Sequence, residues 1–138
     1  MPDNFFSTAE RMYDSSKILH RESHFHNASY MAGYVFECYG KILLSLNPTS
    51  NTRSFSHNII RINTELQYLL TSSSIFGGHR QYIIDMSLQC PQALSSWNPS
   101  NRYADSASSW DGLISQNLQN EIDICWEKLT EMYIDGII

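Results

Sequence analysis

The sequence predicts an all-α protein, an antiparallel bundle of four to five helices that forms a single domain over residues 1–138. Three observations lead to this prediction. Apolar residues recur at three- and four-residue steps along most of the chain, which is the period of an amphipathic helix. The alternation typical of strands persists nowhere for long, and the sequence has no internal repeat. A chain of 138 residues, 42% of them hydrophobic, is also long enough to bury one core.

The N-terminal half divides into three predicted helices. The first covers about residues 4–22, where an apolar stripe recurs. The second begins near Asn27, a residue type that favours helix N-caps, and stops at Asn47-Pro48, because proline cannot continue a helix. After a polar loop, Ser56 can cap a third helix that extends to about residue 70.

The C-terminal half is interrupted more often. The Gly77-Gly78 pair allows the chain to turn, and a fourth helix over about residues 82–88 is predicted to break at Pro91 before a short continuation. Residues 97–112 are rich in Ser, Asn and Asp and lack a sustained period. Long connectors of this kind are commonly functional or mobile. The last predicted helix covers about residues 113–135.

Hydropathy and cysteine usage predict a cytoplasmic protein without a membrane segment. No apolar run approaches the roughly 18 residues that a spanning helix needs, and the first residues lack the basic start and apolar stretch of a signal peptide. Cys38, Cys90 and Cys125 are widely spaced in apolar surroundings, so we expect buried, reduced thiols. No Cys-x-x-Cys spacing favours a structural zinc site, and no cofactor is predicted.

Charge is distributed unevenly along the chain, whose formal net charge is -5. Residues 1–102 carry eight Lys or Arg against seven Asp or Glu, whereas residues 103–138 carry one Lys against seven acidic residues. A protein that grips a nucleic-acid backbone usually shows a cluster of basic residues instead. General nucleic-acid binding is therefore disfavoured.

Three residues of the second predicted helix share one face, namely Gly33, Glu37 and Lys41, at four-residue steps. Glycine costs about 1 kcal/mol relative to alanine inside a helix, so Gly33 indicates that another helix approaches closely there. Glu37 and Lys41 can form a favourable i,i+4 ion pair. A second interpretation is that Glu37 is half-buried and is met by Arg102 from the long segment, because inward-facing charges need partners.

The same helix resembles part of a known family. ASYMAGYVFECYGKILLSL, residues 28–46, resembles the second helix of HEPN domains, a nucleotide-binding family of small helical bundles, although Gly40 stands where the family usually has Leu. FSHNIIRI, residues 55–62, resembles its Ser/Thr-His step into the next helix, and NRYAD, residues 101–105, its Arg-Tyr element. The resemblance implies a HEPN-like bundle and nucleotide or RNA binding, often beside a nucleotidyltransferase partner. The matching helix positions are Ala28, Tyr30, Gly33, Tyr34, Glu37 and Lys41.

The segment HRESHFH, residues 20–26, permits three interpretations. The first follows from the resemblance, since many HEPN proteins are metal-independent RNases with an Arg, four to six residues and then a His, paired across a homodimer. Arg21-x4-His26 fits this spacing; His26 would handle the 2'-hydroxyl proton and Arg21 would stabilise the charged phosphorane. The segment lies between the first two helices, however, whereas the motif of catalytic members is expected in the later helices.

The second interpretation of HRESHFH is a metal site. His20 and His24 are an i,i+4 pair and His26 follows, so two ligands could share one helix face. A closed site would also need His57 or His79 from elsewhere in the chain. The third interpretation, which we favour, is a polar junction between two helices, where Arg21 and the histidines suit the negative end of the helix dipole.

Four carboxylates follow one another at four-residue steps on the last predicted helix; we call Asp123, Glu127, Glu131 and Asp135 the acidic stripe, and Glu121 lies beside it. Like charges at this spacing destabilise a helix by about 0.2–0.5 kcal/mol per pair, so folding alone does not favour the arrangement. A cationic partner would favour it; the alternative is a solvated face that keeps the protein soluble. Exposed aromatic residues of the preceding segment could anchor such a partner: Trp97, Tyr103 and Trp110.

We therefore expect a non-catalytic helical binding protein, most concretely an immunity or antitoxin protein that neutralises a basic, nuclease-type toxin by direct contact. The acidic stripe and residues 97–112 would form its docking surface. Two alternatives stay open: a homodimeric RNase toxin that uses Arg21 and His26, and a nucleotide- or RNA-binding HEPN partner of a nucleotidyltransferase.

Overall fold

The computed structural model describes residues 4–47, 52–72, 78–104 and 110–138. The regular structure within these ranges is helical and includes no strand, so the all-α prediction is confirmed. The α-helices and 3₁₀ helices (η) follow in the order α1 (Phe5–Arg21), α2 (Phe25–Ser45), η1 (Thr52–Phe55), α3 (Ile59–Ser72), η3 (Arg80–Tyr82), α4 (Met86–Gln89), α5 (Pro91–Ser96), η4 (Pro99–Tyr103) and α6 (Gly112–Ile134).

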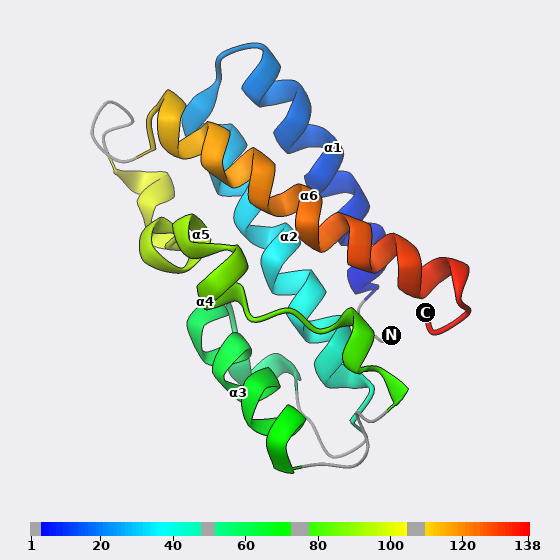
Figure 1. Ribbon diagram of the computed structural model, residues 1–138. Coiled ribbons are helices and arrows are strands. Elements are labelled where there is room, and N and C mark those ends of the chain that lie inside the picture. Colours follow the sequence, from blue (N-terminus) through cyan, green and yellow to red (C-terminus); the bar gives the residue numbers. More distant parts are fainter. Residues whose placement is uncertain (1–3, 48–51, 73–77, 105–109) are drawn as a thin grey trace.

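Helix α2 is the centre of the fold, with α1, α3 and α6 packed around it (Figure 1). Helices α1 and α6 run antiparallel, because Phe6 in the first turn of α1 stacks on Tyr133 in the last turn of α6. Helices α2 and α6 run in the same direction instead, since the ring of Phe25 lies against Gly112 and both helices start there. The sequence predicted an antiparallel bundle, but α2 and α6 are parallel. The chain between them returns to the end of the bundle where α2 began.

The core follows α2 along most of its length. All three cysteines are buried and unpaired, as predicted. No helix within the described ranges is long and apolar enough to cross a membrane. The largest fully buried side chains come from α2, α3, α6 and the segments between them: Phe36, Tyr39, Leu43, Leu44, Ile62, Leu66, Met86, Trp110, Leu118, Ile122 and Leu129.

The junction between α1 and α2 is a C-terminal helix cap of the Schellman type. Ser23 adopts a left-handed conformation with φ of 65°. Its N–H donates to the His20 carbonyl at 3.0 Å, and the His24 N–H donates to the Leu19 carbonyl at 2.8 Å. Because the cap is so short, α2 begins at residue 25, two residues before the predicted Asn27. HRESHFH therefore forms the end of one helix, a tight turn and the start of the next.

The third helix is capped by a different residue from the one predicted. Ser56 has φ of 50° and lies outside the helix. Asn58 caps α3 instead, because its Oδ1 accepts a hydrogen bond from the Arg61 N–H at 3.0 Å. The polar loop predicted before this helix lies partly outside the described residues, and residues 52–55 form η1.

A short extended strap between η3 and α4 replaces the first part of the predicted fourth helix. The buried Tyr39 hydroxyl donates to the Tyr82 carbonyl at 2.6 Å and accepts from the Ile84 N–H at 2.9 Å. The Asn63 side chain of α3 accepts from the Met86 N–H at 3.0 Å. These side chains satisfy backbone groups that a helix would pair internally, so the extended form is stable. The break predicted at the following proline is confirmed, since α5 begins there.

Glu121 of α6 fixes the start of α5. The residue is 7% exposed; its Oε2 accepts from the Gln92 N–H at 2.9 Å and its Oε1 from the Ala93 N–H at 2.8 Å. The first turn of a helix leaves such N–H groups unpaired, and the preceding Pro91 has none. Burial raises the pKa of the Glu121 carboxyl group, an effect that the two backbone hydrogen bonds oppose.

Replacing Glu121 with alanine is expected to lower the free energy of unfolding by about 2–4 kcal/mol, because two N–H groups lose a charged acceptor. Glu121→Gln keeps one acceptor oxygen and is expected to lose roughly half as much. Urea unfolding followed by circular dichroism measures both. Equal stability of Glu121→Ala and the unsubstituted protein would mean that the cap contributes nothing.

Because the pKa of Glu121 is raised, the contribution of this residue to the free energy of unfolding depends on pH. A folded-state pKa above the unfolded value of 4.5 means that the folded state binds the proton more tightly. This contribution to stability is complete below the unfolded pKa and is lost as the pH rises through the folded pKa. The stability of the unsubstituted protein relative to Glu121→Gln should therefore increase on acidification through that window.

Candidate functional site

Four residues of α2 form a continuous polar and aromatic row, which we call the α2 polar row: Tyr30, Tyr34, Glu37 and Lys41. Their spacing of four, three and four residues places them on one face of the helix. Two further side chains meet this face from other parts of the chain, one from the turn before α3 and one from η4. The row therefore gathers polar groups from three separate segments.

Glu37 is the buried centre of an ion cluster within the row. Its side chain is 6% exposed, and its Oε1 accepts hydrogen bonds from Lys41 Nζ at 2.9 Å and His57 Nδ1 at 2.8 Å. The predicted ion pair with Lys41 is confirmed. The predicted contact between Glu37 and Arg102 is wrong, because the turn before α3 places His57 at this carboxylate and η4 carries Arg102 to the other end of the row.

Arg102 binds Tyr30 instead. Its Nη1 donates to the Tyr30 hydroxyl at 3.0 Å, and its guanidinium carbon lies 5.5 Å from the Tyr30 ring centre and 4.8 Å from that of Tyr103. The Tyr30 and Tyr34 hydroxyl oxygens are 2.9 Å apart, and the Tyr34 ring meets the His57 ring edge to face at 5.5 Å. Burial, followed by the hydrogen bond to Tyr30, raises the pKa of the Tyr34 hydroxyl, so Tyr34 remains neutral. Two tyrosines thus connect Arg102 with His57.

Gly33 allows Trp97 to close one side of the α2 polar row. A Cβ atom at Gly33 would lie 1.6 Å from Cε2 of Trp97, so a side chain has no space there. The Trp97 indole N–H donates to the Tyr30 carbonyl at 3.3 Å, and its ring meets Tyr34 edge to face at 5.4 Å. The close approach predicted at Gly33 is confirmed, but the approaching group is an indole that follows α5, not a helix.

The three aromatic anchors predicted in residues 97–112 differ in exposure. Tyr103 is 80% exposed, as predicted. Trp97 is 6% and Trp110 is 1% exposed, so the prediction of exposure is wrong for both. Their neighbours in sequence are polar, but burial of a large indole is favourable when its N–H finds an acceptor; the Trp110 N–H donates to the Ser96 carbonyl at 3.2 Å. Neither tryptophan presents its ring as an anchor on this surface.

The first carboxylate of the acidic stripe is paired within the chain. Asp123 Oδ1 lies 2.8 Å from Lys17 Nζ and accepts a hydrogen bond from the Tyr13 hydroxyl at 2.7 Å. Burial, and then this hydrogen bond, raises the pKa of the Tyr13 hydroxyl. The sequence predicted that Asp123 points outward toward a partner. Instead, Asp123 joins α6 to α1.

The other three members of the stripe differ from one another. Glu131 lies 3.6 Å from Lys128 Nζ on the same helix. Asp135 accepts a hydrogen bond from the Tyr82 hydroxyl, which raises the pKa of that hydroxyl. Glu127 is exposed and makes no hydrogen bond or ion pair with the described residues. The stripe lies on the surface as predicted, but Glu127 is its least engaged carboxylate.

Four aromatic rings stack between α1 and α6, and we call them the α1/α6 aromatic stack. The ring centres are 5.0 Å apart for Tyr13 and Trp126, 5.6 Å for Trp126 and Phe6, and 5.2 Å for Phe6 and Tyr133. Adjacent ring planes differ by 18° or less. Tyr133 is 61% exposed, and the other three rings are partly buried. The stack lies beside Asp123, between the core and the acidic stripe.

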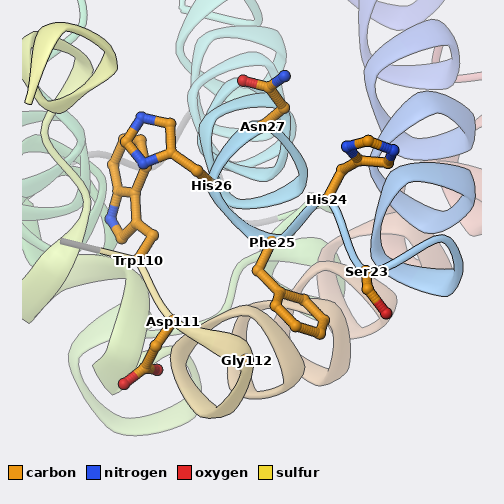
Figure 2. Close-up of a pocket in the computed structure, with 8 residues that line it drawn as sticks. All are labelled: Ser23, His24, Phe25, His26, Asn27, Trp110, Asp111 and Gly112. Carbon is orange, nitrogen blue, oxygen red and sulfur yellow. The ribbon is translucent and has the colours of Figure 1, made fainter. Parts of the chain in front are cut away.

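The histidines of HRESHFH have separate environments. His20 Nδ1 lies 2.7 Å from Ser115 Oγ and so links α1 to α6. Figure 2 shows His24 and His26 pointing away from each other at the start of α2. The ring of His26 packs on Trp110 with centres 4.9 Å apart, and both of its nitrogens are buried without a hydrogen-bond partner.

Within the single chain, this arrangement brings Arg21 and His26 to no common cavity and forms no metal site among the described residues. Arg21 is exposed at the end of α1 and does not line the cavity beside His26, which residues 23–27 and 110–112 form. Among the residues that the structure describes, no three His, Cys, Asp or Glu side chains are grouped to hold a metal ion. The two distant histidines considered as ligands are also apart, since His57 lies at the α2 polar row and His79 precedes η3.

Two features of the surface were missed by reasoning from the sequence. The α1/α6 aromatic stack was not predicted, because an apolar helical stripe does not show which rings stay partly exposed. His57 was not paired with Glu37, although the HEPN resemblance includes the Ser-His step at residues 56–57. The resemblance of residues 56–57 to the Ser-His step was the signal in the sequence that could have pointed to His57.

Comparison of the chain with protein-family models, with curated proteins and with solved structures finds no match in any of the three. The likeness of residues 28–46 to the HEPN helix therefore stays a prediction. The structure itself supports the broader statement that the described chain is an all-helical bundle.

Proposed function

We propose that this protein is a non-catalytic, HEPN-like helical binding protein that binds a basic protein partner through the face formed by α1 and α6. Most concretely, it would be an immunity or antitoxin protein that neutralises a basic, nuclease-type toxin by direct contact. The observation that carries the proposal is the α1/α6 aromatic stack beside the acidic stripe. Aromatic ring faces and carboxylates both attract Lys and Arg side chains.

The chain contains an internal example of such a contact. Lys17 Nζ lies 5.3 Å from the Tyr13 ring centre and 2.8 Å from Asp123 Oδ1. A cationic side chain of a partner would find a carboxylate at Glu127 and an exposed ring of the stack at Tyr133, further along α6. Glu127 is available for that contact, because no described side chain engages it.

The charge distribution supports a basic partner in particular. Residues 103–138 carry seven carboxylates against one Lys, and on α1 the exposed Glu10 and Asp14 offset Arg11 and Lys17. A surface with an excess of one charge attracts an oppositely charged partner over roughly 8 Å at physiological salt and speeds its association. We therefore expect the association rate to fall as salt is added.

Charge reversal on α6 tests the proposal. Glu127→Lys combined with Glu131→Lys is expected to weaken binding to a basic protein encoded in the neighbouring reading frame by about tenfold or more, because attraction becomes repulsion. Surface plasmon resonance at several salt concentrations would separate the association rate from the dissociation rate. The non-catalytic proposal predicts that no RNA is cleaved by the purified chain.

A matched control reverses two charges elsewhere, with Glu22→Lys at the α1/α2 turn and Glu65→Lys on α3. Net charge changes equally, but the α1/α6 face is intact, so binding should change by less than about threefold. Equal weakening by both double variants would mean that net charge alone drives binding. No weakening by the α6 variant would refute docking at this face.

A second candidate is a nucleotide- or RNA-binding HEPN-like protein beside a nucleotidyltransferase. The exposed pair Arg102 and Tyr103 favours it, because a tyrosine can stack on a base while a guanidinium pairs with phosphate. Loss of single-stranded RNA or ATP binding in Arg102→Ala with Tyr103→Ala would support this candidate. RNA cleavage that disappears in His26→Ala would instead support the RNase alternative with Arg21 and would refute the non-catalytic proposal.

A further inference from the structure

A second cavity, which no residue of the acidic stripe lines, lies between α1, α2 and the turn before α3. Its volume is about 340 Å³. The α2 polar row supplies one wall and the first half of α1 supplies another. The residues that matter for its chemistry are Phe5, Met12, Tyr34, Glu37, Lys41 and His57.

The charged groups that line this cavity are one carboxylate and two basic side chains. Lys41 and His57 share the single carboxylate of Glu37, and α1 brings Arg11 close enough for its charge to act on Cys38 in the cavity wall. Burial, and then the negative charge of Glu37, raises the pKa of the Cys38 thiol to about 12, and the positive charges of Lys41 and Arg11 oppose this rise. The single carboxylate of Glu37 is therefore shared by one fixed cation and one imidazole, which leaves donor capacity for an anion.

The cationic groups also have unused hydrogen-bonding capacity. Lys41 is 8% exposed and donates one of its three N–H groups to Glu37. His57 uses Nδ1 to bind Glu37, and its side chain is 51% exposed, so its Nε2 edge is accessible. The carboxylate that holds Nδ1 fixes the ring orientation. In its imidazolium form, His57 donates to Glu37 from Nδ1 and can donate to an anion from Nε2.

The rest of the lining is apolar. Phe5 and Met12 of α1 are partly buried and pack against the core, and Lys41 Nζ lies 5.8 Å from the Phe5 ring centre. Small-ligand sites commonly combine such apolar walls with a few polar groups that fix orientation. This combination suits a ligand with one charged end and an apolar body.

We propose that this cavity binds a small amphipathic organic anion. Its carboxylate or phosphate head accepts hydrogen bonds from Lys41 Nζ and His57 Nε2, and its apolar body lies against Phe5 and Met12. Glu37 acts as the positioning residue that orients both donors. The site is independent of the basic partner proposed for the α1/α6 face, so either assignment can fail without the other.

Titration of the ¹⁵N-labelled protein with three probes of similar shape tests the site: phenylacetate, phenyl phosphate and 2-phenylethanol. We expect at least one of the two anions to shift the amide signals of α2 and residues 56–58, with Kd of about 1 mM or tighter, which is ordinary for a ligand of this size. The neutral alcohol should bind about tenfold more weakly or worse. The preferred anion identifies the head group.

His57→Gln removes one donor from a half-exposed position and is expected to weaken anion binding about fivefold or more. His24→Gln is the matched control, because His24 is an exposed histidine outside this cavity, and it should leave binding unchanged. The site is refuted if the alcohol binds as tightly as the anions, if neither anion binds, or if the two histidine variants behave alike. Shifts centred on Arg102 would also overturn it, by placing the anion at η4.

Discussion

Gly33→Ala is expected to lower the free energy of unfolding by about 3 kcal/mol or more, although alanine is the better helix former by about 1 kcal/mol. The added Cβ would lie 1.6 Å from Cε2 and 1.9 Å from Nε1 of Trp97. An indole cannot yield by that distance while it stays buried against α2, so Trp97 has to leave its place. Urea unfolding measures the loss, and a red shift of tryptophan fluorescence would report the displaced indole.

Another glycine and a second-site substitution provide the controls for this prediction. Gly78→Ala should be nearly neutral, since nothing lies within 4 Å of its added Cβ. Trp97→Leu in the Gly33→Ala background should recover part of the loss, because a smaller side chain leaves space for the methyl group. If Gly33→Ala were as stable as Gly78→Ala, the close packing of Trp97 on α2 would be refuted.

The long helices were predictable because each of them buries a continuous apolar stripe. The stripes of α1, α2 and α6 fixed their limits to within a few residues, and Asn4 and Asp111 cap α1 and α6 through local hydrogen bonds. The strap between η3 and α4 was not predictable in this way. Its backbone is satisfied by Tyr39 and Asn63, which lie far away in sequence, and no local pattern encodes such a contact.

In the candidate site, too, contacts within one helix were predictable and contacts between distant segments were not. The pair Glu37 and Lys41 was predicted because both residues lie on one helix at i,i+4. The third partner had to come from another segment, and spacing along the chain does not show that His57, rather than the predicted Arg102, reaches the carboxylate. The exposure of Trp97 was misjudged for a related reason, because its polar neighbours describe the segment and not the space that Gly33 leaves on α2.

Glu37→Leu is expected to be the other severe substitution, with a loss of about 3–5 kcal/mol, because it leaves the ammonium group of Lys41 buried without a counter-charge. The Lys41 side chain is 10% exposed, and its hydrogen bond to Glu37 holds it inside. His57 would lose the same carboxylate but is 51% exposed, so water can replace the contact. Urea unfolding by circular dichroism measures the loss directly.

The double variant Glu37→Leu with Lys41→Met separates stability from function at this cluster. Removing both charges and keeping similar volume avoids an unpaired buried ion, so its unfolding free energy should lie within about 2 kcal/mol of the unsubstituted protein. The double variant should nevertheless fail to bind the anionic probes, because the ammonium donor and the carboxylate that orients His57 are both gone. If it were as unstable as Glu37→Leu alone, the unpaired charge would not be the cause of the loss. If it folded and still bound phenylacetate or phenyl phosphate, the ion cluster would be a structural contact and not an anion site.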